Sequence, residues 1–204
     1  MKRITLLQLD TDFPRIPGDV GSFDTFKCEL EIIRVPNATV KQVVNADPNQ
    51  IDLDPFFDAI DKATGDLITT SCGFLSPFQN ELEGLCDVPF ISSSLRQLEH
   101  LKNIYTPSEL QIITFDAAKL GPTHLPIGCE VFNTSVFGLN SDAHLKSIIE
   151  NNITHIDISK ASADICAVVR ANKKKSTKGI LLECTNLPPY KTDIRRISDV
   201  PIYD

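Results

Sequence analysis

A motif that occurs twice constrains the fold of this chain most. Cysteine, leucine, proline and an aromatic residue share one spacing in Cys72–Phe78 and in Cys184–Tyr190, and the offset is 112 residues (184 − 72). The offset holds without a gap to the end of the chain, where Asp87-Val88-Pro89 falls on Asp199-Val200-Pro201. We interpret this as an internal duplication, in which each copy places one thiol after an apolar strand and before a helix.

The composition bounds the class of protein. The chain has 204 residues, enough for one large domain or two small ones, with 42% hydrophobic and 23% charged residues, as in ordinary globular proteins. A net charge of −7 argues against nucleic acid or an anionic membrane as a partner. The N-terminus enters a strand pattern without a signal peptide, and no apolar run approaches the roughly 18 residues of a membrane span. We therefore expect a cytoplasmic protein with reduced thiols.

The six cysteines and four histidines indicate neither a disulfide framework nor a metal site. No Cys-x-x-Cys pair occurs, and the histidines stand apart without metal-ligand spacing. Four of the cysteines are interpreted as buried small hydrophobic residues, which is what most free cysteines are. These four are Cys28, Cys86, Cys129 and Cys166.

Short apolar runs alternate with helical patterns along the whole chain, which is typical of parallel α/β structure. The predicted strands cover residues 4–10, 30–35, 66–71, 88–91, 110–116, 129–133, 179–183 and 201–203. The predicted helices run from an Asp54 N-cap to Gly65, from a Ser76–Gln79 capping box onward, and over 95–103, 142–151, 162–175 and 188–197. Residues 1–106 and 107–204 are predicted to form two similar halves, the second lacking a counterpart of the helix at 95–103.

Ligands of open parallel sheets bind outside the carboxyl ends of the strands. Both repeated cysteines lie at such ends, so facing halves would bring them to one cleft. Other polar residues at strand ends have two interpretations each. Asp10 either closes a turn or orients a substrate ammonium, and Ser92–Ser94 either cap a helix or hold a carboxylate. Three further residues receive mainly structural roles beside a less favoured functional one: Asn186 as a helix cap or a substrate contact, Glu183 as a strand residue or a general base, and His124 as a loop residue or a catalyst.

Two opposed thiols suit one class of reaction. Backbone amides at a helix N-terminus favour a thiolate, which lowers the pKa of a cysteine placed there. One thiolate can then remove a proton from one face of a carbon, while the opposite thiol delivers a proton to the other face. Such a pair inverts a stereocentre without a cofactor, and Cys72 and Cys184 are the candidates.

The chain resembles the aspartate/glutamate racemase superfamily along essentially its whole length. The carrying stretches are Leu9-Asp10-Thr11, Thr69–Phe74, Phe90–Leu95, Thr114-Phe115-Asp116 and Leu182–Tyr190. The resemblance implies two pseudo-symmetric, flavodoxin- or Rossmann-like halves with the active site in the cleft between them. It also implies Cys72 and Cys184 as the catalytic acid and base. The implied substrate-binding residues are Asp10, Thr70, Ser71, Gly73, Ser93, Thr114, Thr185 and Asn186.

The expected function is that of a cofactor-independent isomerase, a racemase or epimerase of a small amino-acid-like carboxylate. Glutamate racemases carry Cys-Asn-Thr and Cys-Thr-His, whereas this chain has Cys72-Gly73-Phe74 and Cys184-Thr185-Asn186, so the motif neighbours leave the identity of the amino-acid-like substrate open. The alternatives are a related isomerase or lyase of the maleate isomerase, hydantoin racemase or arylmalonate decarboxylase type, or a non-catalytic ligand-binding protein. No cofactor or metal is expected, and a homodimer is one candidate assembly.

Overall fold

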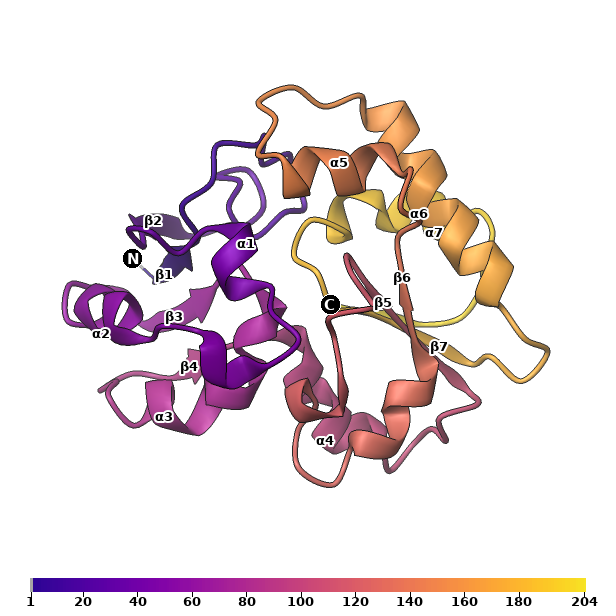
Figure 1. Cartoon of the computed structure of the whole chain (residues 1–204), viewed down its shortest axis with the longest axis horizontal. Coiled ribbons are helices and arrows are strands. Elements are labelled where there is room, and N and C mark those ends of the chain that lie inside the picture. Colours follow the sequence, from indigo (N-terminus) through magenta and orange to yellow (C-terminus); the bar gives the residue numbers. More distant parts are fainter. Residues whose placement is uncertain (1) are drawn as a thin grey trace.

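The computed structural model describes residues 2–204, and its two parallel sheets share one strand order. The first sheet has the order β2-β1-β3-β4 and the second β6-β5-β7-β8 (Figure 1). Every strand pair is parallel. The strands are β1 (Arg3–Gln8), β2 (Glu29–Arg34), β3 (Leu67–Thr70), β4 (Phe90–Ile91), β5 (Leu110–Thr114), β6 (Val136–Gly138), β7 (Gly179–Leu182) and β8 (Ile202–Tyr203). The predicted fold of two pseudo-symmetric parallel α/β halves is confirmed.

The sequence duplication is visible in the boundaries of the elements. Strand β3, helix α3 (Gln79–Glu83) and strand β4 coincide, at an offset of 112 residues, with β7, helix α7 (Lys191–Arg195) and β8. In both halves this unit supplies the strand that precedes the cysteine, the helix that follows it and the edge strand of the sheet. The repeat therefore fixes the position of each thiol relative to its own sheet.

Most helices are short and depend on packing against the sheets, since isolated helices of this length are marginal in water. Besides α3 and α7, the α-helices of residues 2–204 are α1 (Val40–Val43), α2 (Asp54–Ile60), α4 (Leu98–Leu101), α5 (His144–Glu150) and α6 (Ile158–Asn172). Only α6 is long, and Asp157 caps it by accepting a hydrogen bond from the Lys160 amide. No helix within residues 2–204 combines the length and apolar character that crossing a membrane requires.

The predicted strand at 129–133 is wrong. Residues Glu130–Ser135 form a 3₁₀ helix, and the strand beside β5 is β6, which begins at Val136. Cys129, Phe132 and Ser135 are buried while the residues between them are more exposed. A spacing of three is the period of a 3₁₀ helix, and a short apolar run does not distinguish it from a strand.

Two predicted helix starts are also corrected. Asp54 is the first helical residue of α2 rather than its cap, and the helix ends at Ile60, before Gly65. Ser76 lies inside a 3₁₀ helix, Gly73–Phe78, so the predicted capping box does not form. The Gln79 side chain instead donates to the Phe90 carbonyl and accepts from Ser92, which ties α3 to the end of β4.

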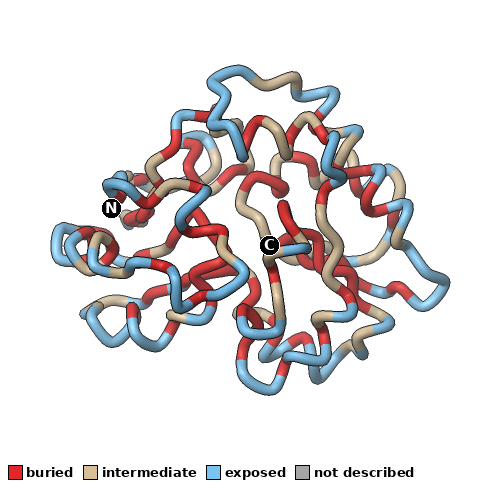
Figure 2. Tube along the Cα trace, in the orientation of Figure 1, coloured by how far each residue is buried: buried red, intermediate tan, exposed pale blue. Residues whose placement is uncertain are grey.

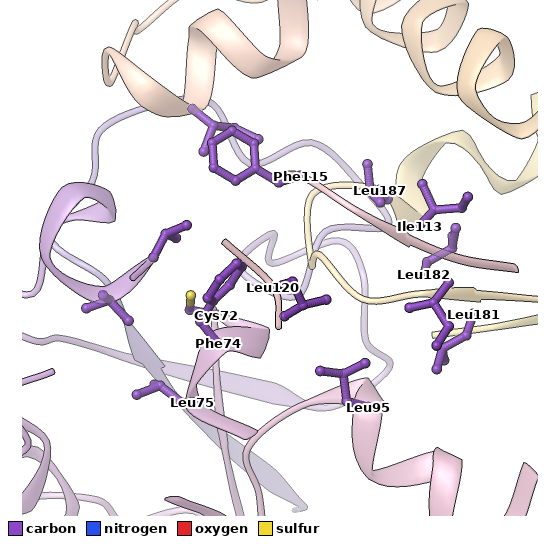
Figure 3. Close-up of a cluster of buried hydrophobic side chains, with 14 of the residues drawn as sticks. Cys72, Phe74, Leu75, Leu95, Ile113, Phe115, Leu120, Leu181, Leu182 and Leu187 are labelled. Atoms are coloured by element: carbon purple, nitrogen blue, oxygen red, sulfur yellow. The ribbon is translucent and has the colours of Figure 1, made fainter. Parts of the chain in front are cut away.

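The core lies along the two sheets, with the central strands β5 and β7 of the second half fully buried (Figure 2). Apolar side chains from both halves meet in one cluster. Figure 3 shows Cys72, Phe74 and Leu75 of the first half in this cluster with Phe115 and Leu187 of the second. The ends of the strands that carry the thiols therefore face an apolar junction between the halves.

Candidate active site

Cys72 and Cys184 line one small cavity between the two halves, as the sequence led us to expect for their positions. Cys72 follows β3 by two residues and Cys184 follows β7 by two residues. The cavity has a volume of about 30 Å³, room for about two water molecules. Its walls include Phe13, Phe74 and Phe115, so it is mostly apolar.

Hydrogen bonds to the backbone hold the first thiol in place. Thr70 Oγ1 accepts from the Cys72 amide at 3.3 Å and donates to the Ser92 carbonyl at 2.7 Å. Ser71 Oγ accepts from the Leu9 amide, and the Ser71 carbonyl accepts from Thr185 Oγ1 across the cleft at 2.9 Å. These hydroxyls fix the strand end, and of the two residues only Ser71 lines the cavity.

The loop from Asp12 to Ser22 brings a buried ion pair to the cavity. Arg15 lies over the Phe13 ring at 4.5 Å, and its Nη1 lies 3.2 Å from Asp19 Oδ1. Both side chains are almost fully buried. The Arg15 Nε–H has no partner, and Arg15 lines the cavity. The sequence signal for this contribution is an arginine and an aspartate in a proline- and glycine-containing segment with three apolar residues.

The same loop is linked to the second thiol. Cys184 Sγ lies 3.5 Å from Asn186 Oδ1 and donates to it, and Asn186 Nδ2 donates to Asp19 Oδ2 at 2.5 Å. Asn186 therefore orients the thiol instead of capping the helix at Pro188, whose N-cap position is Leu187. Gly18, with φ +103°, lies against the Pro189 backbone, so the loop packs on the second copy of the repeated motif.

Glu183, expected to be a structural strand residue, lies at the cavity. Its side chain is buried, and Oε2 accepts from Thr114 Oγ1 at 2.6 Å while Oε1 has no partner. Burial raises the pKa of Glu183 to about 7, and the hydrogen bond from Thr114 opposes part of that rise. A carboxyl group with this pKa exchanges its proton near neutral pH.

The expected lowering of the thiol pKa values is wrong. Burial is the larger cause and the charge of Glu183 the second of a rise in the pKa of Cys72 to about 12. The same two causes raise the pKa of Cys184 well above its ordinary value. Backbone amides of Phe74 and Asn186 favour the thiolates as predicted, but they offset only part of the burial cost. Both thiols are therefore protonated near neutral pH.

Several expected site residues lie away from the cavity. Asp10 pairs with Arg34, Thr114 donates to Glu183, and Ser93 caps the Leu95 amide. Ser94 donates to the Leu182 carbonyl, so it joins the two halves. Of the expected substrate-binding set, the residues that line the cavity are Ser71, Gly73, Thr185 and Asn186.

The remaining candidates have structural surroundings. His124 is buried in a 3₁₀ helix, where Nδ1 accepts from the Gly121 amide, and its Nε2 therefore donates to the Asn45 carbonyl of the other half. Cys129 and Cys166 are buried, whereas Cys28 and Cys86 are half-buried, so the expectation of full burial is wrong for the latter two. Within residues 2–204, histidine, cysteine and acidic side chains form no cluster suited to a metal ion.

Solved structures share this architecture at low sequence identity. Allantoin racemase from Pseudomonas fluorescens is 14% identical with a TM-score of 0.60, covering 99% of this chain and 85% of that one. Aspartate racemase from Picrophilus torridus is 13% identical with a TM-score of 0.59, covering 100% and 89%. An arylmalonate decarboxylase is 12% identical with a TM-score of 0.58, covering 99% and 86%. The chain has the fold of the aspartate/glutamate racemase superfamily. No family model matches it.

Curated relatives by sequence are lyases. A dimethylsulfoniopropionate lyase of Durusdinium sp. clade D is 29% identical over 98% of this chain, and dimethylsulfoniopropionate lyases 7 and 3 of Emiliania huxleyi are 25% and 26% identical over 98%. The chain spans 70%, 62% and 56% of the lengths of these relatives. The expectation of an isomerase that inverts a stereocentre is therefore wrong, and the lyase alternative is the better supported one.

Proposed function

We propose that this protein is a carbon–sulfur lyase acting on dimethylsulfoniopropionate or a close analogue. The observation that carries the proposal is similarity to lyases over 98% of the chain, combined with a cavity lined by two thiols. Because the chain spans only part of each relative, the activity of those whole proteins is an inference for this one.

The reaction needs one base. The base removes a proton from the carbon next to the substrate carboxylate, the released electron pair forms a carbon–carbon double bond, and the bond from the neighbouring carbon to sulfur breaks. The sulfur keeps the electrons of that bond and leaves as neutral dimethyl sulfide, while the carbon skeleton becomes acrylate. No proton has to be returned to the opposite face, so the second thiol is not required for turnover.

Cys184 is the better placed of the two thiols to act as this base. Its sulfur is oriented by Asn186, which Asp19 holds in turn, and it is the less buried of the pair. A nucleophile or base that is oriented by a chain of two further groups is a common catalytic arrangement. A cationic sulfonium beside the thiol would oppose the burial cost that keeps it protonated, so substrate binding favours loss of the thiol proton to water and formation of the thiolate that acts as the base.

Arg15 is the proposed partner of the substrate carboxylate. Its Nε–H is buried without an acceptor, and a buried donor in that state costs about 1–3 kcal/mol until an acceptor arrives. A carboxylate oxygen at this position would satisfy it. The stacking of Arg15 on Phe13 and its contacts with Asp19 and Thr11 hold the guanidinium in place for that contact.

The test is release of dimethyl sulfide from dimethylsulfoniopropionate, measured by headspace gas chromatography with acrylate as the matched product. Cys184→Ala should lower the rate about 100-fold or more, since a positioned base contributes that much. Cys166→Ala, a buried cysteine on α6 remote from the cavity, is the control and should keep the wild-type rate. An inactive wild-type protein, or Cys184→Ala with near-normal turnover, would overturn the proposal.

A further inference from the structure

The cavity contains a buried carboxylate oxygen that nothing in the protein satisfies. Glu183 is 2% exposed, and only its Oε2 accepts a hydrogen bond, from Thr114. Oε1 has no partner, and Glu183 lines the cavity together with both thiols. A buried polar atom without a partner is destabilising, so it points to a group that arrives from outside the chain.

Gly73 makes room for this oxygen. A Cβ atom on Gly73 would lie 1.9 Å from Glu183 Oε1 and 3.0 Å from the Glu183 carbonyl oxygen, so no larger residue fits beside the carboxylate in its present position. Gly73 and Glu183 each adjoin one of the repeated cysteines, Gly73 following Cys72 and Glu183 preceding Cys184. The two copies of the motif therefore contribute complementary parts to one wall of the cavity.

We propose that Glu183, in the space left by Gly73, forms a cation subsite that selects carboxylates bearing a fully substituted onium group, a sulfonium or a quaternary ammonium. The role of this subsite in turnover rests on the proposed function. A primary ammonium would need several acceptors for its N–H groups, whereas Oε1 is the one free carboxylate oxygen here. An onium group has no N–H and is stabilised by one carboxylate and aromatic walls.

The surrounding side chains support this cation. Phe74 and Phe115 line the cavity beside Glu183, and aromatic faces attract onium groups. Arg15 lines the same cavity and supplies a positive charge for the other end of a zwitterionic ligand. Since burial raises the pKa of Glu183 to about 7, a bound cation would shift the carboxyl group to its charged form.

The experiment compares two ligands of the same shape by isothermal titration calorimetry at pH 8. These are 3-(trimethylammonio)propionate and 4,4-dimethylpentanoate, in which a carbon replaces the charged nitrogen. The wild-type protein should bind the zwitterionic trimethylammonium ligand about tenfold or more tightly than its anionic carbon analogue, which lacks the positive charge. Glu183→Gln, which keeps the shape and removes the charge, should lower this ratio to about threefold or less. Glu81→Gln, an exposed glutamate on α3, is the matched control and should leave it unchanged.

Gly73→Ala provides a second variant that keeps the charge but displaces the carboxylate. It should reduce the ratio as Glu183→Gln does, with melting temperatures confirming that both variants are folded. Absence of a preference in the wild type, or a preference that persists in Glu183→Gln, overturns the subsite; a preference that persists in Gly73→Ala overturns the part assigned to Gly73. If the wild type shows the preference but releases no dimethyl sulfide, the proposed lyase fails and the subsite stands.

Discussion

At the scale of single residues, burial governs the chemistry of this cavity more than the neighbouring amides do. The sequence places Cys72 and Cys184 correctly, each before a 3₁₀ helix, but it does not show how completely they are covered. The sign of their pKa shift depends on that coverage. For the same reason the sequence could not show that Glu183 and Arg15 reach the cavity, because both follow from the way the halves meet.

Burial leads to a prediction about thiol reactivity. A rise in the pKa of Cys72 from 9.0 to about 12 lowers its thiolate fraction about a thousandfold at neutral pH. The half-buried Cys28 should therefore react with iodoacetamide at least about tenfold faster than Cys72 or Cys184 in the free protein. Peptide mapping by mass spectrometry at several times would measure this order, and labelling of Cys184 first would contradict it.

Glu183 gives a prediction about stability and pH. Its pKa rises from 4.5 to about 7 on folding, so the folded state retains a proton that the unfolded state has lost between these values. Stability due to this group therefore falls as pH rises through that window, by about 3 kcal/mol in all. Glu183→Gln should therefore reduce the difference between the free energies of unfolding in urea measured at pH 5 and at pH 8. Burial lowers the pKa of His124, so the contribution of His124 to stability rises with pH. This contribution is the same in the wild type and in Glu183→Gln, and it therefore drops out of the comparison. If the free energy of unfolding changed with pH equally in the wild type and in Glu183→Gln, the raised pKa of Glu183 would be contradicted.

At the scale of elements, the duplication explains which parts of the fold could be predicted. Strands β3 and β7 and the edge strands β4 and β8 follow from the repeat and from clear apolar runs. The errors lie where a 3₁₀ helix takes the place of a strand, at Glu130–Ser135, or of a capped α-helix, at Gly73–Phe78. In both places tertiary packing decides between conformations that the local pattern leaves nearly equal.

The loop Asp12–Ser22 carries the prediction at this scale. Gly18 has φ +103°, and a Cβ there would lie 2.7 Å from Pro189 Cα, so Gly18→Ala introduces both backbone strain and a clash with backbone. We expect a loss of about 2 kcal/mol in unfolding free energy. Turnover should fall as well, because Arg15 and Asp19 are displaced. Gly121→Ala is the control, since nothing lies within 4 Å of its Cβ, and it should change stability by less than about 0.5 kcal/mol. Equal effects of the two variants would contradict the role of the loop.

At the scale of the whole molecule, the two halves close over a cavity smaller than the proposed substrate. A volume of about 30 Å³ holds water but not a carboxylate with a dimethylsulfonium group. Contacts between the halves keep it closed, among them Thr185 to Ser71, His124 to Asn45, and Asn152 to the backbone of Asp12. Substrate entry therefore requires either that the two halves separate or that the Asp12–Ser22 loop moves away from α5.

Asn152 offers a way to test this opening. It has a positive φ of 50°, its Oδ1 accepts from the amides of Asp12 and Phe13, and its Nδ2 donates to Asp12 Oδ2. Asn152→Ala removes these bonds between the loop and the second half but leaves the side chains that line the cavity unchanged. Because Cys184 must become exposed to react, its alkylation should be several-fold faster in this variant, whereas Cys166, away from the junction, should keep its rate. Asn151→Ala is the matched control, since the side chain of Asn151 bonds only within its own helix region. If Cys184 reacted at the wild-type rate in Asn152→Ala, entry to the cavity would have to follow another route than release of the Asp12–Ser22 loop.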